Sequence, residues 1–332
     1  MTHKIVIRTY RPRDLPALVD LINAADAVDK LERATTLQEM EHEMSFPTAH
    51  PETDCFLAWA EAGETGAPPQ LVGYSDLYVR PGNPEQETES TIYTWGEVHP
   101  QWRRQGLGRR LLERSYRRAL EYLPQLKTER VYFYGSSRDV RVSCRALYTA
   151  FGMEPVRYFV NMVRALDEDL PAVTLPPGYR LRTFDPEHDA ETVWRVDNAA
   201  FRDHWGHTEG PLEEFLHWIR RPYFRPELWF LAEEEATGRV VGLGLSIIDP
   251  DWIAQTGRQE GYVDTLAVLR EHRGRGLGTA LLVHSLHALR AAGMEAAHLH
   301  ADAENLTGAV RLYERVGFRV RKTSIAYRKV LR

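Results

Sequence analysis

Apolar residues recur along the chain at two spacings, one typical of helices and one typical of strands. Residues 276–291 carry leucines three or four positions apart, which predicts an amphipathic helix. Short apolar runs at 261–268 and 296–301 flank it and predict strands. The second half of the chain then reads strand 179–183, helices 187–201 and 211–219, strands 228–233, 240–248 and 261–268, helix 276–291, strand 296–301, helix 307–316 and strands within 318–328.

The first half of the chain repeats this order. Its predicted elements are strand 4–9, helix 14–28, strands 55–61, 71–79 and 90–98, helix 106–122, strand 130–134, helix 140–150 and strand 156–163. The motif Arg-x-x-Gly-x-Gly occurs at 103–108 and again at 273–278. The chain therefore consists of two copies of one domain. We predict domains at 1–165 and 179–332, joined by an acidic, proline-rich linker at 166–178 and each of the α/β class with a mixed sheet (α+β).

The composition agrees with two soluble domains. Of the 332 residues, 43% are hydrophobic, and no apolar run approaches the roughly 20 residues of a membrane helix. The N-terminus enters a predicted strand without an apolar signal segment, so we expect a cytoplasmic protein. Cys55 and Cys144 are too few for a disulfide framework. The net charge of −5 argues against a protein that coats nucleic acid, and we expect neither nucleic acid nor a membrane as a partner.

Each Arg-x-x-Gly-x-Gly motif lies between a predicted strand and a leucine-rich helix. Glycines allow a ligand to approach the backbone closely, and the first N–H groups of a helix attract anions. Arg273 and Arg275 can add charged contacts to phosphate oxygens. We therefore predict a pyrophosphate site, the other interpretation being an ordinary tight turn. Two standard nucleotide motifs do not fit, because Leu281 stands where the dinucleotide fingerprint needs a third glycine and no lysine follows Gly278.

The two motifs resemble the acyl-CoA-binding motif of the GNAT superfamily of N-acetyltransferases, Arg/Gln-x-x-Gly-x-Gly/Ala. The resemblance extends to Asn305, Ala309, Tyr313 and Gly317, which are spaced like that family's second cofactor element. It implies acetyl-CoA as co-substrate, no metal, and acetyl transfer to the primary amine of a small molecule by direct attack in a ternary complex. The competing hypothesis is a non-catalytic acyl-CoA-binding or regulatory protein made of degenerate domains.

The resemblance also implies where the cofactor lies. A V-shaped split is expected between strands 261–268 and 296–301, with the pantetheine along the first of them and the pyrophosphate on the glycine turn. The cofactor-binding residues predicted in the second copy are Leu266, Ala267, Val268, Arg273, Gly274, Arg275, Gly276, Leu277, Gly278, Thr279 and Asn305. Those predicted in the first copy are Val98, Arg103, Arg104, Gln105, Gly106, Leu107, Gly108 and Arg109. A backbone N–H near Leu266 would polarise the thioester carbonyl.

Two catalytic side chains are predicted in the second copy. Tyr313 stands where the family keeps the general acid that protonates the departing CoA thiolate, and the alternative is a core tyrosine. Asp264 is the candidate base, because it lies in strand 261–268 with the parity of Leu266 and close to the expected acetyl group. A substrate-amine anchor and a solvated strand residue are its alternatives. Glu260, at the start of the strand, is the second candidate base.

The first copy lacks several of these residues. At the positions that align with Asn305, Asp264 and Leu266 of the second copy, the first copy has Val140, Thr94 and Gly96. Tyr148 and the glycine turn persist. We therefore predict a non-catalytic first copy, which either binds acetyl-CoA without turnover or serves as a scaffold.

Two further polar groups carry alternative interpretations. His298, His300 and Asp302 alternate along a predicted strand, as metal ligands do and as the polar face of any strand does, and the second interpretation is favoured. The loop 202–210 contains Asp203, His204, Trp205 and His207. The family resemblance places this loop at the acceptor pocket, so these residues are candidates for substrate specificity, the alternative being a plain surface loop.

Overall fold

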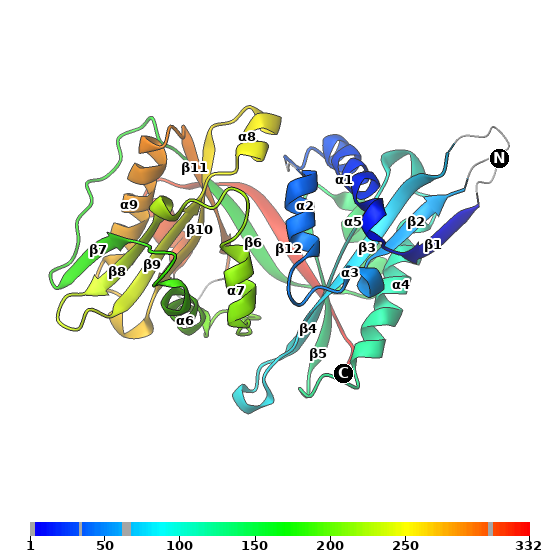
Figure 1. Cartoon of the computed structure of the whole chain (residues 1–332), viewed down its shortest axis with the longest axis horizontal. Coiled ribbons are helices and arrows are strands. Elements are labelled where there is room, and N and C mark those ends of the chain that lie inside the picture. Colours follow the sequence, from blue (N-terminus) through cyan, green and yellow to red (C-terminus); the bar gives the residue numbers. More distant parts are fainter. Residues whose placement is uncertain (1–3, 33–34, 62–67, 305–307) are drawn as a thin grey trace. The chain divides into compact units, whose positions relative to one another are not determined.

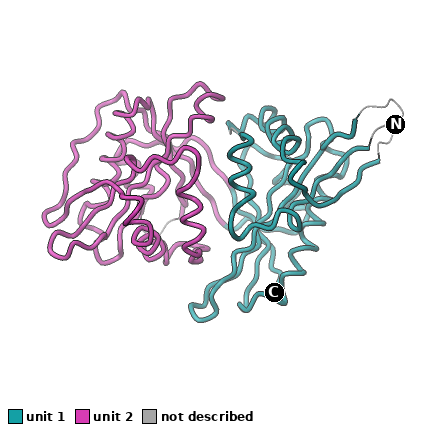
Figure 2. Tube along the Cα trace, viewed as in Figure 1, with its two compact units in different colours: residues 1–156, 325–332 teal, residues 157–324 magenta. Residues whose placement is uncertain are grey.

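A computed structural model describes residues 4–32, 35–61, 68–304 and 308–332, and its chain divides into two compact units. Unit 1 contains residues 1–156 and 325–332, and unit 2 contains residues 157–324 (Figure 2). Each unit is a mixed sheet covered by helices, which confirms the predicted fold class. No helix in the described ranges has the length and apolar character to cross a membrane.

Unit 1 follows the predicted order of elements closely. Its elements are β1 (Ile5–Thr9), α1 (Leu15–Asp29), α2 (Leu37–Met44), α3 (Pro51–Asp54), β2 (Phe56–Ala60), β3 (Gln70–Arg80), β4 (Ser90–Val98), α4 (Leu107–Tyr122), β5 (Val131–Arg138) and α5 (Val142–Ala150) (Figure 1). Its strands lie in the order β1-β2-β3-β4-β5, and β4 and β5 form the parallel pair. Helix α4 packs on β3 and β4 because Leu107 and Leu111 on its inner face are buried.

Unit 2 repeats this arrangement. Its elements are β6 (Glu154–Ala165, from residue 157), β7 (Tyr179–Thr183), α6 (Ala190–Phe201), α7 (Leu212–Trp218), β8 (Trp229–Glu234), β9 (Val240–Ile247), α8 (Pro250–Thr256), β10 (Glu260–Val268), α9 (Leu277–Ala291), β11 (Ala296–Asp302), α10 (Ala309–Arg315) and the first part of β12 (Arg319–Val330). Its strands lie in the order β6-β11-β10-β9-β8-β7. The predicted leucine stripe of α9 is buried, with Leu281, Leu286 and Leu289 fully inaccessible to solvent.

The compact units do not coincide with the boundaries predicted from the repeat. The strand expected to close the first domain lies in unit 2, where Phe159 to Ala165 of β6 pair antiparallel with the whole of β11. The end of β12 belongs to unit 1 instead, where Leu331 N–H donates to Val131 O at 2.9 Å. Residues 166–178, predicted as a linker, also belong to unit 2, and Leu166 is buried in its core. The two repeats therefore exchange their last strands, which a linear pattern of apolar residues does not encode.

The short helices α2, α3 and α8 were not predicted from the apolar pattern, and α2 and α8 show why. Helix α2 is capped at its N-terminus by Thr36, whose hydroxyl accepts a hydrogen bond from Glu39 N–H, and the helix buries only Met40. Helix α8 is capped at its N-terminus by Asp249, whose carboxylate accepts hydrogen bonds from two backbone N–H groups, and the helix has no buried residue. Both helices depend on their N-caps, so they lack the apolar stripe that reveals longer helices.

Candidate active site

The glycine turns of the two units have the same open backbone. Gly106 (φ +80°) and Gly276 (φ +88°) stand immediately before helices α4 and α9 in the left-handed conformation, and no side chain caps either helix. A Cβ atom at either glycine would meet no atom within 4 Å. Because the first N–H groups of a helix have no partner within the helix, each turn offers donors to an anion on its open side.

The two turns share a second unusual residue. Gly274 has φ +76°, and its counterpart Arg104 has φ +63°, a conformation that costs a non-glycine residue free energy. Both turns therefore follow the same path, although the sequence of the first copy suits it less well.

The motif arginines have partners within the protein. Arg103 Nε donates to Val98 O and Arg273 Nε donates to Val268 O, both at 3.0 Å. Arg273 Nη2 also donates to Ala200 O of α6 at 2.6 Å, and Arg275 Nη1 donates to Tyr179 Oη at 2.9 Å. These arginines hold the turn to its strand and to neighbouring elements, in addition to the positive charge that they bring to it.

The strands separate as the family resemblance implied. In unit 2, β10 and β11 pair only at Glu260 to Tyr262, opposite Ala296 to His298. In unit 1, β4 pairs with β5 from Ser90 to Thr94 and no further toward its glycine turn. Beyond these points one edge of β10 and of β4 is free of its parallel neighbour, so each split leads to a glycine turn.

A β-bulge distinguishes the two splits. In unit 2 the pairing of β10 with β9 shifts between Val263 and Thr265, which leaves Asp264 as the extra residue. In unit 1, β4 pairs with β3 in an uninterrupted register from Val98 to Thr91. Asp264 therefore has no counterpart in unit 1, and the predicted equivalence with Thr94 is wrong.

The bulge also corrects the predicted parity of Asp264. Leu266 lies opposite Gly244, whose Cβ direction points at Ser285 and Leu281 of α9. Thr265 lies opposite Leu245 on the other face of the sheet, and its hydroxyl donates to Asp264 Oδ2 at 3.2 Å. An extra residue reverses the alternation of side chains. Asp264 therefore faces the α6 and α7 layer, away from the face of Leu266.

A second carboxylate, Asp197 of α6, faces Asp264. It lies on the inner face of the helix, among the buried side chains of Val193, Val196 and Ala200. Burial, and then the charge of Asp264, raises the pKa of Asp197 to about 7. Burial likewise raises the pKa of Asp264, against the opposing charge of Arg221. Asp197 was not predicted from the sequence, although an acid on the apolar face of a predicted helix was a usable signal.

The two tyrosines of the repeated motif are both buried. Burial raises the pKa of Tyr313, on α10, to about 12, so the hydroxyl keeps its proton at neutral pH. Tyr148, on α5, lies against Gly135, where a Cβ atom would approach its hydroxyl to 2.8 Å. Asn305 lies outside the described residues.

Glu260 is engaged in ion pairs at the closed end of the split. Its carboxylate accepts from Arg321 Nη1 at 2.7 and 2.9 Å, and His298 Nδ1 lies 3.4 Å away. These partners overcome the effect of burial and lower the pKa of Glu260 to about 2. A carboxylate so strongly held in its ionised form is a poor proton acceptor, so Glu260 does not suit the role of base.

The other polar residues singled out in the sequence lie on β11 and in the loop after α6. His298 and His300 share one face of β11 with Asp302, which is paired with Arg157 at 2.9 Å. Within the described ranges, no group of three or more His, Cys, Asp or Glu side chains is arranged to hold a metal ion. In the loop after α6, Trp205 lies 6.4 Å from the Phe159 ring. In the same loop, Asp203 pairs with Arg270 and the His204 ring contacts the Phe201 ring.

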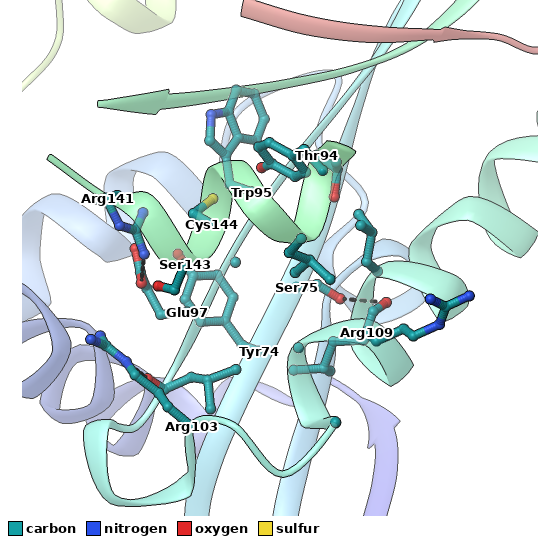
Figure 3. Close-up of a pocket in the computed structure, with 18 of the residues that line it drawn as sticks. Tyr74, Ser75, Thr94, Trp95, Glu97, Arg103, Arg109, Arg141, Ser143 and Cys144 are labelled. Atoms are coloured by element: carbon teal, nitrogen blue, oxygen red, sulfur yellow. Dashed lines mark hydrogen bonds and ion pairs between the residues drawn. The ribbon is translucent and has the colours of Figure 1, made fainter. Parts of the chain in front are cut away.

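Unit 1 contains a pocket of about 340 Å³ at its own split (Figure 3). Its lining includes several residues predicted for the cofactor, namely Val98, Arg103, Arg104, Gly106, Gly108 and Arg109, together with Cys144 and Tyr148. Gln105, also predicted for the cofactor, is not among the lining residues, and its side-chain amide donates to Gln101 O. Leu107 and Leu277 are buried in the cores of their units, so only their backbone groups can bind a ligand.

Charged side chains fill the α1 side of this split. Figure 3 shows Arg141 beside Glu97, with which it forms an ion pair. Arg141 also pairs with Asp29 at 3.2 Å, and Arg103 pairs with the same carboxylate at 2.6 Å. Unit 1 therefore keeps the glycine turn and the tyrosine but holds its carboxylates in ion pairs.

Known proteins share both the sequence and the fold. The profile of the Acetyltransferase (GNAT) family matches residues 19–153 and 190–318. The chain is 30% identical to a mycothiol acetyltransferase of Thermobifida fusca over 99% of each chain. It is 39% identical to one of Thermomonospora curvata over 67% of this chain and 68% of the relative. The tandem arrangement of this chain, with the better-formed site in its second half, also resembles mycothiol synthase.

Solved structures agree with these relatives. A GCN5-related N-acetyltransferase from Sphaerobacter thermophilus superimposes with a TM-score of 0.73 and 27% identity, over 99% of this chain and 96% of that one. A tandem GNAT protein from the clavulanic acid biosynthesis pathway has a TM-score of 0.67 over 98% of each chain, at 20% identity. None of these matches favours a non-catalytic binding protein. This chain therefore belongs to the GNAT acetyltransferase family and is an acetyl-CoA-dependent N-acetyltransferase.

Proposed function

We propose that acetyl transfer takes place in unit 2 and that unit 1 is non-catalytic. Acetyl-CoA lies in the split between β10 and β11, with its pyrophosphate at the N-terminus of α9 and its pantetheine along Leu266 to Val268. Residues 273–279 contact the phosphates through their backbone and their charge. The open turn at Gly276 and the unpaired edge of β10 support this placement.

The acid pair supplies the base. Two like charges in a partly buried site disfavour double ionisation, so Asp197 and Asp264 share one proton near neutral pH. The pair binds the ammonium group of the acceptor and then takes a proton from it, because only a neutral amine attacks the thioester carbon. A backbone N–H near Leu266 stabilises the oxyanion that forms.

Tyr313 acts as general acid in the second half of the reaction. Its raised pKa keeps the hydroxyl protonated, which suits donation to the CoA thiolate as the C–S bond breaks. Direct attack needs no covalent enzyme intermediate.

The acceptor is a small molecule with a primary amine. An acidic site attracts a cation, and the relatives named mycothiol acetyltransferase make the acceptor of those enzymes the first amine to assay. In unit 1 the carboxylates of Glu97 and Asp29, on the corresponding side of the split, are instead neutralised by ion pairs with Arg141 and Arg103.

The single observation that carries this proposal is the bulge that turns Asp264 toward Asp197, in unit 2 alone. The test measures CoA thiol release from acetyl-CoA with a panel of amines, for wild type and for Asp264→Asn. We expect kcat to fall by roughly 10²-fold, the lower range for general base catalysis. The control in unit 1 is Thr94→Val, at the position that the spacing of the two glycine turns pairs with Asp264 although the bulge is absent there, and it should leave kcat unchanged. Equal kcat for Asp264→Asn and wild type contradicts the assignment.

A further inference from the structure

Acetylation of an ammonium group releases one proton in every turnover. In the balanced reaction, R–NH₃⁺ and acetyl–S–CoA give R–NH–acetyl, HS–CoA and H⁺. The nitrogen forms a bond to the acetyl carbon and loses two protons, the C–S bond breaks, and the sulfur gains one proton. The second proton must reach solvent before the acid pair can serve again.

The acid pair lies below the surface, between β10 and the α6 layer. The next side chain on the same face of β10 is Tyr262, two residues before Asp264. The Tyr262 hydroxyl lies 3.4 Å from His300 Nδ1, within hydrogen-bond distance, and His300 is exposed. Exchangeable groups therefore lie on one face of β10 from the bulge to Tyr262, and the Tyr262 hydroxyl contacts an exposed histidine.

We propose that Tyr262 and His300 carry the proton of each turnover from the Asp197–Asp264 pair to solvent, an inference that rests on the proposed function. The proton passes from the carboxyl to the Tyr262 oxygen while the Tyr262 proton moves to His300 Nδ1. The imidazolium then loses its Nε2 proton to water. Exchange of the Nδ1 proton for one at Nε2 through water, with rotation of the Tyr262 hydroxyl, returns both groups to their starting forms. No phenolate forms, in keeping with burial and the charge of Asp264, which raise the pKa of Tyr262 well above its usual range.

The neighbouring histidine does not offer the same exit. His298 is enclosed by the rings of Tyr262 and Trp252, whose centroids lie 4.9 and 5.6 Å from its own, and its Nδ1 faces the Glu260 carboxylate. His300 instead meets Tyr262 edge to face, at a ring distance of 5.9 Å. Imidazole exchanges protons with water near neutral pH, which suits an exposed terminal group.

Other titratable and charged groups surround this chain from every packed element. They are Asp197 of α6, Arg221 after α7, Asp249 before α8, Glu260 and Asp264 of β10, His298 and Asp302 of β11, Tyr313 of α10, Arg157 of β6 and Arg321 of β12. All of these groups affect how kcat varies with pH. The relay is therefore tested by chemical rescue with imidazole and by the solvent deuterium isotope effect.

The test compares wild type with Tyr262→Phe and His300→Ala at saturating acetyl-CoA and amine. We expect kcat to fall by roughly tenfold or more in both variants, since proton transfer then limits turnover. Added imidazole should restore His300→Ala several-fold and leave Tyr262→Phe unchanged. The solvent deuterium isotope effect on kcat should rise in both, while the KM for acetyl-CoA stays the same.

A matched control lies in unit 1. Tyr93 pairs with Tyr134 as Tyr262 pairs with His298, so Tyr93→Phe removes the corresponding hydroxyl and should change neither kcat nor the isotope effect. A loss of kcat in His300→Ala without imidazole rescue and without a larger isotope effect shows a structural role, and overturns the relay. Wild-type kcat in both variants also overturns it. If Asp264→Asn retains full activity as well, the proposed function itself fails; if that variant is inactive, only the relay fails.

Discussion

Gly276→Glu tests the pyrophosphate site at the turn before α9. Gly276 has φ +88°, and the space where its Cβ would lie is empty, so a side chain there projects toward the predicted ligand without a clash inside the protein. The left-handed conformation costs about 1–2 kcal/mol for any residue with a Cβ. Gly276→Ala shares this cost and therefore separates strain from charge.

The carboxylate adds a repulsion that alanine lacks. At about 6 Å from a phosphate charge, with an effective dielectric constant of about 20, the repulsion is about 2–3 kcal/mol. Acetyl-CoA affinity should therefore be weaker in the Glu variant than in the Ala variant by roughly 30- to 150-fold. The site is open to solvent, so salt should reduce the difference.

The assay is the KM for acetyl-CoA at low and high ionic strength, with direct titration of acetyl-CoA by calorimetry. Gly106→Glu is the control, because its backbone and open surroundings match while unit 1 is predicted to be non-catalytic. It should leave kcat within a few-fold of wild type. Equal acetyl-CoA affinities for Gly276→Glu and Gly276→Ala would refute the phosphate assignment, and loss of activity in Gly106→Glu alone would show that the active half is unit 1.

Two further predictions concern the reacting groups. Tyr313→Phe should lower kcat at least tenfold and leave the affinity for acetyl-CoA intact, since the hydroxyl acts only as the C–S bond breaks. The control is Tyr148→Phe in unit 1, which should leave kcat unchanged. Wild-type turnover of Tyr313→Phe across the pH range would show that Tyr313 is only a core residue. The pKa of about 7 for Asp197 means that its carboxylate is ionised above that pH and protonated below it, so kcat/KM for the amine should fall as the pH drops through about 7. Asp197→Asn should remove this inflection from the pH–rate profile, and an unchanged profile would show that another group controls it.

The sequence alone predicted the repeat, the order of its main elements and both glycine turns. These features depend on local spacing, such as the leucine stripe of α9 and a glycine with positive φ before the helix. The bulge at Asp264 was not predicted, because one extra residue in a strand preserves the local composition while it turns a side chain to the other face. Asp197 was missed for a related reason. Its partner comes from a strand far away in the sequence, and only the fold brings the two carboxylates together.

The exchange of last strands has a consequence for synthesis of the protein. Unit 1 includes residues 325–332, among them Ile325 and Tyr327 in its core, although the rest of the unit ends at residue 156. Domains usually fold one after another as the chain leaves the ribosome. Here the N-terminal unit must wait for residues 325–332, so it reaches its final structure only after the whole of unit 2 has been synthesised.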